Sequence, residues 1–196
     1  DLENLPDLWS SVSADLRSRQ VQTLAGLLEI SRAGRVQDFE ETLLSSALNI
    51  LYTPKEQGGH GFDGAHPPIL ADLYAVLKEG NDTLLEDAAV GADDMLAYAR
   101  VTANLRQSLR ALIQGPLGKV LNGQTTEPLN LDYPAICVDV SRVPKGDRKL
   151  KAALLLVCWA DGFGAVEGAH VLADAGLELQ QLDGLAHRAA VRVGAE

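Results

Sequence analysis

Apolar residues recur at helical spacing through most of the first 114 positions, and this pattern constrains the fold more than any other feature. Such a period places apolar side chains on one face of a helix, so the sequence predicts an array of amphipathic helices. The first stripe predicts a long helix over residues 7–32 that ends near Gly34, with Pro6 where a helix start tolerates proline. Its apolar face comprises Leu8, Val12, Leu16, Leu24, Leu27 and Leu28.

A second stripe predicts a helix that stops before Pro54. We expect Asp38 to be its N-cap, because Glu41 follows three residues later at capping-box spacing. The apolar face of this helix comprises Phe39, Leu43, Leu44, Ala47, Leu48 and Leu51. Residues 55–68 come next and predict a loop, because glycine and proline are frequent in them.

Two further stripes and a short piece complete the predicted array. Helical spacing resumes at Ile69 and ends at Gly80, and residues 83–90 form a short helical candidate. A long helix is predicted over residues 92–114, closed by the pair Gly115-Pro116. The apolar faces are Ile69, Leu70, Leu73, Tyr74 and Leu77 in the earlier helix, and Tyr98, Leu105, Leu109 and Leu112 in the later one.

Near residue 116 the long stripes of helical spacing give way to turn residues and β-branched runs, and we predict a domain boundary there. Residues 1–116 read as an all-helical region, and residues 117–196 as a partial α/β segment with one or few strands. Residues 134–140, PAICVDV, are a candidate buried strand that would need a second copy or a parent protein to pair with. Asp147 is the expected N-cap of a following helix that is apolar on nearly every side through Ala160, so we expect this helix to be fully buried. The predicted fold class is therefore mainly α with a partial α/β segment.

Composition bounds the class of protein. The chain has 17 Lys and Arg against 27 Asp and Glu, so its net charge of −10 argues against broad coating of nucleic acid. The longest apolar run, residues 152–160, is far shorter than the roughly 20 residues that span a bilayer, so we expect no transmembrane segment. Cys137 and Cys158 lie in apolar runs, which predicts buried thiols and a reducing compartment. The first residues show no signal-peptide pattern.

The sequence contains no complete catalytic motif. The segment GPLGKV at residues 115–120 has a Gly-Lys pair but lacks the first glycine and the hydroxyl of a phosphate-binding loop, so it predicts a turn. Asp139 follows an apolar run, but Val140 stands where a glutamate would be needed beside a magnesium ligand. No G-x-S-x-G motif occurs, and neither cysteine has a histidine nearby in sequence. The sequence therefore predicts no catalytic residue.

One loop contains three candidate metal ligands. His60, Asp63 and His66 lie within seven residues of one another. Nothing else in the sequence supplies an evident further protein ligand at the spacing that metal sites use. We predict a solvated loop and no metal.

The most unusual local feature is a basic cluster consisting of Arg142, Lys145, Arg148, Lys149 and Lys151. It contains five of the seventeen cations against a single acid, Asp147. Cations at a helix start oppose the helix dipole unless an anion or an acidic surface lies beside them. The cluster is therefore a candidate contact for phosphate or DNA, and the alternative is a solvated helix start.

The order of segments resembles one known family. LLEI and NILYTP are followed by HPPILADLYAVL, then by LIQGPLGKVLNGQTT, LNLDYPAICVDVSRV and DRKLKAALLLVCWADGF. This order resembles the C-terminal half of conjugative-transfer and type IV secretion ATPases, members of the FtsK/HerA-like group of the RecA-type superfamily. The resemblance covers roughly residues 24–180, and its most specific parts are residues 115–126 and 135–159. It implies a helical insertion followed by part of a RecA-like core.

The same resemblance leaves the nucleotide site unassigned. In the family the phosphate-binding loop precedes the helical insertion, and the magnesium-binding strand follows a helix that would end here near Gln180. LELQQ instead runs directly into LDGLAHRAAVRVG, which is similar to the helix that the family places after that strand. No catalytic, cofactor or metal residue is therefore carried over. ATP and Mg²⁺ are expected for a complete family member and not for this chain by itself.

The resemblance implies a fragment or degenerate relative of a conjugation-type DNA-transfer or secretion ATPase. Such a chain would contribute assembly, partner or DNA contacts and would not hydrolyse ATP by itself. The alternative is a stand-alone acidic helical module that binds other proteins. The expected partners are a second copy, the remainder of a parent ATPase, DNA or secretion-channel proteins. We expect the chain to be cytoplasmic and to reach the inner face of the membrane through these partners.

Overall fold

A computed structural model describes residues 5–32, 34–63, 66–115, 117–124, 143 and 146–160, with side chains from residue 16 onward. The chain divides into two compact units. One unit is Leu24–Thr125, and the other joins Asp1–Thr23 to Thr126–Glu196. The described residues are mainly helical and contain no strand, which confirms the mainly α class.

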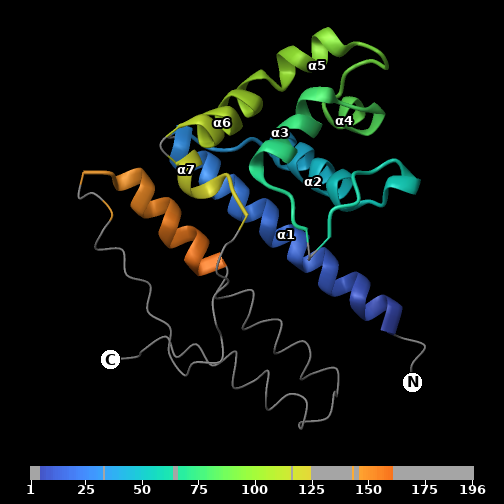
Figure 1. Ribbon diagram of the computed structural model, residues 1–196. Coiled ribbons are helices and arrows are strands. Elements are labelled where there is room, and N and C mark those ends of the chain that lie inside the picture. The colour runs from blue at the N-terminus through green and yellow to red at the C-terminus, as the bar shows by residue number, and fades with distance from the viewer. Residues whose placement is uncertain are drawn as a thin grey trace. The chain divides into compact units, whose positions relative to one another are not determined.

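The unit Leu24–Thr125 is a helical array (Figure 1). It begins within α1 and ends after the short helix that follows the Gly115 turn. The elements are α1 (Leu5–Arg32), α2 (Asp38–Tyr52), the 3₁₀ turn η2 (Lys55–Gln57), α3 (Leu70–Glu79), α4 (Asp82–Asp87), α5 (Met95–Val101), α6 (Ala103–Gln114) and α7 (Gly118–Leu121). The predicted helices over residues 7–32 and 69–80 and the stop before Pro54 are confirmed.

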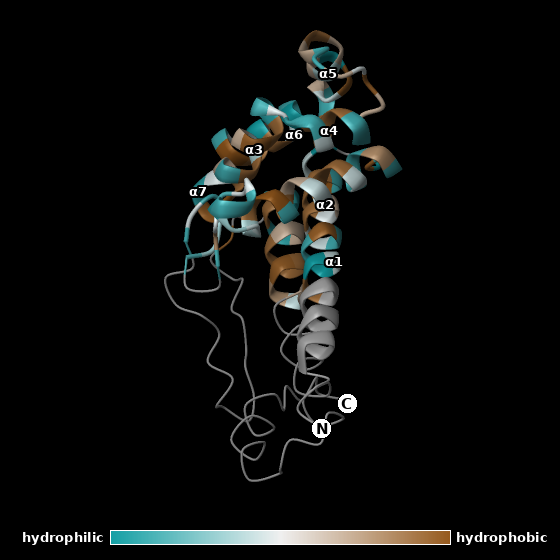
Figure 2. Cartoon of the chain, turned by 90° about the vertical axis from the view of Figure 1, so that its right-hand side faces the viewer, coloured by the Kyte–Doolittle hydropathy of each residue, from teal (hydrophilic) through white to brown (hydrophobic). Residues whose placement is uncertain are grey.

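Leucines fill the core of this unit. Helix α2 packs against α3 and α4, α3 packs against α6, and α6 contacts α5 and α7. Figure 2 shows hydrophobic residues running along α2 and α3. The fully buried leucines are Leu28, Leu43, Leu44, Leu51, Leu77, Leu84, Leu105, Leu109 and Leu112. The described residues of the predicted stripes are therefore mostly buried, although Phe39 in the first turn of α2 and Leu16 of α1 are exposed. The side chains of Leu8 and Val12 lie outside the described residues.

The predicted N-cap of α2 is wrong by one residue. Gln37 is the cap, and the Glu40 carboxylate accepts the Gln37 N–H at 2.8 Å. Asp38 already lies inside the helix, and Glu41 is exposed. Glu40 follows Gln37 by three residues, and Glu41 follows Asp38 by three residues, so both have capping-box spacing. Glu40 differs because the Arg32 side chain of α1 bonds to it.

The predicted helix over residues 92–114 is two helices, α5 and α6, that meet at Thr102. Thr102 is fully buried, and its hydroxyl donates to the Tyr98 carbonyl at 2.8 Å. Bonding of a threonine hydroxyl to the preceding turn bends a helix. The start is also later than predicted, because Asp93 has a φ of +66° and Asp94 caps the Ala97 N–H at 2.9 Å.

The loop after α2 folds back onto the end of that helix. The N–H groups of His60, Gly61 and Phe62 donate to carbonyls of Ile50, Thr53 and Leu51 at 3.1, 2.8 and 3.0 Å. Gly58 turns the chain with a φ of +84°. A Cβ at Gly59 would lie 2.1 Å from the Thr53 carbonyl oxygen. This segment therefore caps the helix through its backbone, as helix ends require.

Besides the first part of α1, the described residues of the other unit include a helix over residues 148–160. The Asp147 carboxylate accepts the Leu150 N–H at 3.0 Å, so the predicted N-cap is confirmed. Burial on nearly every side is wrong: Ala153 is fully buried, but Leu155 and Trp159 are each 59% exposed. The candidate strand at residues 134–140, with Cys137 and Asp139, lies outside the described residues.

Candidate functional site

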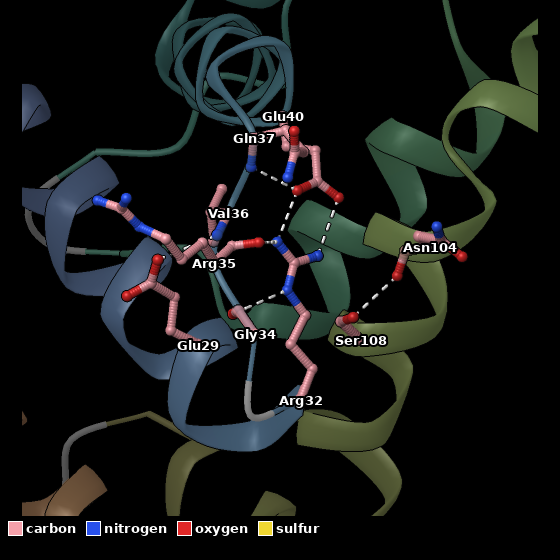
Figure 3. Close-up of polar contacts among 9 residues, drawn as sticks. All are labelled: Glu29, Arg32, Gly34, Arg35, Val36, Gln37, Glu40, Asn104 and Ser108. Atoms are coloured by element: carbon pink, nitrogen blue, oxygen red, sulfur yellow. Dashed lines mark hydrogen bonds and ion pairs between the residues drawn. The ribbon is translucent and has the colours of Figure 1, made fainter.

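A polar groove of about 480 Å³ lies where the end of α1, the α1–α2 loop and α6 meet. Figure 3 shows its polar contacts. Residues of the loop and the first turn of α2 form one wall, and α6 forms the other. Its polar lining includes Arg32, Arg35, Gln37, Glu40, Asn104 and Gln107.

An ion pair holds the inner end of the groove. Arg32 Nη1 donates to Glu40 Oε1 at 2.9 Å, and Nη2 donates to Glu40 Oε2 at 2.6 Å. The Arg32 side chain is 19% exposed and the Glu40 side chain 3% exposed. Paired parallel bonds between a guanidinium and a carboxylate are the strong, orientation-specific form of this contact.

The same groups fix the α1–α2 loop. Arg32 Nη2 also donates to the Arg35 carbonyl, and the Arg32 Nε donates to the Gly34 carbonyl at 3.4 Å. The Val36 N–H donates to the Glu29 carboxylate at 3.0 Å. The side chain of Arg32 therefore satisfies backbone carbonyls of the loop that follows α1, which have no partner within a helix.

Hydrogen bonding sets the protonation states of this pair. Burial by itself would raise the pKa of Glu40, but the bonds from Arg32 and Gln37 and the charge of Arg32 outweigh it, so the pKa lies below its ordinary value. The hydrogen bond to Glu40 raises the pKa of Arg32. Glu40 therefore stays ionised and engaged, which leaves it unsuited to act as a general base.

The opposite wall of the groove presents uncharged groups. Asn104 and Gln107 are exposed on α6, and the Ser108 hydroxyl donates to the Asn104 carbonyl at 2.8 Å. The lining contains no histidine or cysteine. Amides beside a satisfied ion pair are suited to hold a polar segment of chain and offer no activated nucleophile.

A second polar cluster lies beneath α5. The Tyr98 hydroxyl, in a side chain that is 1% exposed, donates to the Leu77 carbonyl at 2.9 Å. Burial raises the pKa of Tyr98 to about 12, with Arg106 lowering it and Asp87 raising it. Arg106 Nη2 donates to the Ala99 carbonyl at 2.6 Å. These bonds tie α5 to the end of α3 and to α6.

The basic cluster is described in part. Arg148, Lys149 and Lys151 lie in the first turn of the helix over residues 148–160 and are exposed or half-buried. Arg142 and Lys145 lie outside the described residues. The described residues therefore place three of its five cations on one helix turn.

The loop histidines lie at the surface. His60 stacks on Phe62 with ring centroids 6.5 Å apart, and the Asp63 carboxylate accepts the His66 N–H at 2.7 Å. Where side chains are described, no group of three His, Cys, Asp or Glu residues could hold a metal ion.

The Gly115 turn does have a structural role. A Cβ at Gly118 would lie 1.8 Å from the Ile113 carbonyl oxygen, and a Cβ at Gly115 would lie 2.4 Å from that of Ala111. The Asn122 side chain then accepts the Ala71 N–H at 3.0 Å. These contacts explain both glycines as requirements of close packing.

One exposed apolar surface was not predicted. On α5, Leu96 is 66% exposed, Met95 43% and Val101 39%. Leu96 precedes the buried Tyr98 by two residues, which places it roughly 200° around the helix, on the opposite side. The two-residue spacing between Leu96 and Tyr98 therefore indicates an exposed leucine. A prediction of one long helix over residues 92–114 does not use this spacing.

Around α5, Met95 and Leu96 lie about 100° apart and Leu96 and Val101 about 140° apart, with the exposed Arg100 between the last two. These apolar residues therefore surround the exposed side of this short helix, and we call Met95, Leu96 and Val101 the α5 surface.

Comparison with protein families, curated proteins and solved structures finds no match to this chain. None of the helices in the described part of the chain has the length and apolarity needed to cross a membrane.

Proposed function

We propose that this chain is an assembly and partner-binding element of a conjugation-type DNA-transfer or secretion ATPase. In this proposal the helical array corresponds to the insertion, and residues 117–196 to a partial RecA-like α/β core. The chain does not hydrolyse ATP by itself. ATP and Mg²⁺ act in a complete enzyme, through residues that this sequence does not supply.

The observation that carries the assembly role is the α5 surface. Exposed large apolar side chains gathered on one short helix are typical of protein contact sites, whereas single exposed ones are ordinary. Leu96, the most exposed of them, is held outward because Tyr98 is anchored in the core. The ATPase family itself is supported by the order of segments in the sequence alone.

A stand-alone acidic interaction module is the second candidate. It is favoured by the charge around the α5 surface, where residues 79–101 contain six acids and one base. This candidate needs no parent ATPase.

The gene sequence preceding the codon for Asp1 separates the two candidates. A segment G-x-x-x-x-G-K-[ST] encoded there would support the ATPase, because this loop holds the nucleotide phosphates. A gene without it would overturn the ATPase proposal in favour of the module. An ATPase assay of the chain with Mg²⁺ should show no turnover, and turnover abolished by mutating Asp139→Asn would contradict the proposal.

A further inference from the structure

The helix over residues 148–160 presents a stripe that combines charge with apolar surface. Arg148, Lys151, Leu155 and Trp159 are spaced by three, four and four residues, so they lie on one helix face. Arg148 is exposed, and Leu155 and Trp159 are each 59% exposed. We call these four residues the basic–apolar stripe. Tryptophan and arginine are the residue types most enriched in the energetic centres of protein interfaces.

The α5 surface has the complementary character. Its apolar residues are accompanied in the same stretch of chain by one exposed base, Arg100 on α5, and by five exposed acids: Glu79, Asp82, Glu86, Asp93 and Asp94. The acids outnumber the base, so the charge of this stretch is negative. Gly80 lies against Met95 and Tyr98, since a Cβ there would approach both side chains to 3.1 Å. Glu79 is therefore adjacent to the α5 surface, and Asp93 and Asp94 immediately precede it.

We propose that the α5 surface of one copy binds the basic–apolar stripe of a second copy. Apolar side chains would meet apolar side chains, and Arg148 and Lys151 would approach the acids around α5. A contact between two α5 surfaces would instead bring like charges together, which disfavours it. Because the two surfaces differ, the contact is head-to-tail, and repetition leads to a closed ring or an open chain of copies.

This contact deepens the proposed function by naming the surfaces through which the chain assembles. The stripe spans about 20 Å of helix and α5 about 10 Å. A stable standard-size interface buries about 800 Å² on each partner, which two elements this short do not reach by themselves. We therefore expect reversible, concentration-dependent association that weakens as salt screens the charges.

Sedimentation velocity on the full chain tests the proposal, at protein concentrations from about 5 to about 500 µM, where a contact below standard size is partly dissociated. The unmodified chain should associate, and added salt should weaken the association. Leu96→Glu and Trp159→Glu should each weaken it at least tenfold. Val120→Glu, at an apolar residue of α7 that is 52% exposed, is the matched control and should leave it unchanged.

Mixing the two weakened variants decides whether the contact is head-to-tail. Leu96→Glu retains an intact stripe and Trp159→Glu an intact α5 surface, so together they should form a one-to-one heterodimer. A chain that is monomeric throughout, or association unaffected by either variant, would overturn the proposal. So would the absence of heterodimer. Leu96→Ser and Trp159→Ser repeat the test if a glutamate variant loses helical circular dichroism. The gene-sequence test is independent, so either proposal can fail alone.

Discussion

Arg32 in the last turn of α1 and Glu40 in the first turn of α2 form a two-bond ion pair that closes the loop between these helices. The pair is nearly enclosed, and each partner also bonds the loop backbone. Its removal therefore affects two helices at once.

We expect Arg32→Ala to lower the free energy of unfolding by about 2–4 kcal/mol, because it leaves the buried Glu40 carboxylate without its cation. Denaturant unfolding monitored by circular dichroism measures the change. Arg35→Ala, three residues away on the exposed loop, is the matched control and should shift stability by no more than about 0.5 kcal/mol. Equal effects of the two variants would show that the ion pair has no special role.

Glu40 predicts a loss of stability in acid. Its pKa is lowered in the folded chain, so its contribution is present above its unfolded pKa and is lost as pH falls through the folded value. The thermal unfolding midpoint of the chain should therefore decrease as the pH is lowered below about 4, the ordinary range of a glutamate pKa. Glu40→Gln should flatten this part of the profile. An unchanged slope in that variant would assign the acid sensitivity to other carboxylates.

Gly118→Ala should destabilise the helical unit by about 2 kcal/mol or more, because the new methyl group overlaps the Ile113 carbonyl and the backbone must move. Gly123→Ala is the control, since no atom lies within 4 Å of a Cβ at that position. Thermal unfolding compares the two. A stable Gly118→Ala variant would mean that the turn adjusts without cost.

Tyr98→Phe should cost about 1–2 kcal/mol, because the Leu77 carbonyl loses a buried donor. The raised pKa of Tyr98, about 12, also contributes stability that is complete below its ordinary value of 10 and lost as pH rises through 12. Absorbance titration should show one phenolate that forms late, and Tyr98→Phe should remove it. If Tyr98→Phe instead removes a tyrosine that titrates near its ordinary pKa, the tyrosine with the raised pKa is not Tyr98.

The basic cluster gives a prediction about DNA. Each phosphate neutralised on a single strand contributes about −0.7 to the slope of log K against log salt, so four to five contacts predict a slope near −3. The double variant Arg148→Glu/Lys149→Glu should remove most of this binding. Fluorescence anisotropy at two salt concentrations measures it. Equal binding by both proteins, or none at low salt, would reduce the cluster to a solvated helix start.

Local periodicity predicted the helices whose ends depend on local chemistry. Glycine at the end of α3 and proline after α2 stop a helix whatever surrounds it, so these limits were predicted correctly. The break at Thr102 depends on burial of that residue between packed helices, which periodicity does not contain. Glu40, and not Glu41, takes part in the capping box because it also binds Arg32. The α1–α2 loop brings Arg32 close to Glu40, and a helical period does not predict this contact.

The polar groove could not be predicted for the same reason. Its walls come from segments far apart in sequence, and Arg32, Gln37 and Asn104 stand in no motif. The basic cluster could be recognised in the sequence because its five cations lie within ten consecutive residues. Its apolar continuation, Leu155 and Trp159, was assigned to a buried face, since composition does not tell which side of a helix has a partner.

The loop that folds back onto α2 has an evolutionary consequence. Three successive N–H groups, of His60, Gly61 and Phe62, meet three carbonyls at the helix end. Inserting or deleting one residue between Thr53 and His60 would shift all three donors out of register, whereas a substitution such as Glu56→Gln at the exposed turn leaves the backbone unchanged. We therefore expect descendants of this sequence to vary in composition here while keeping the length of the segment fixed.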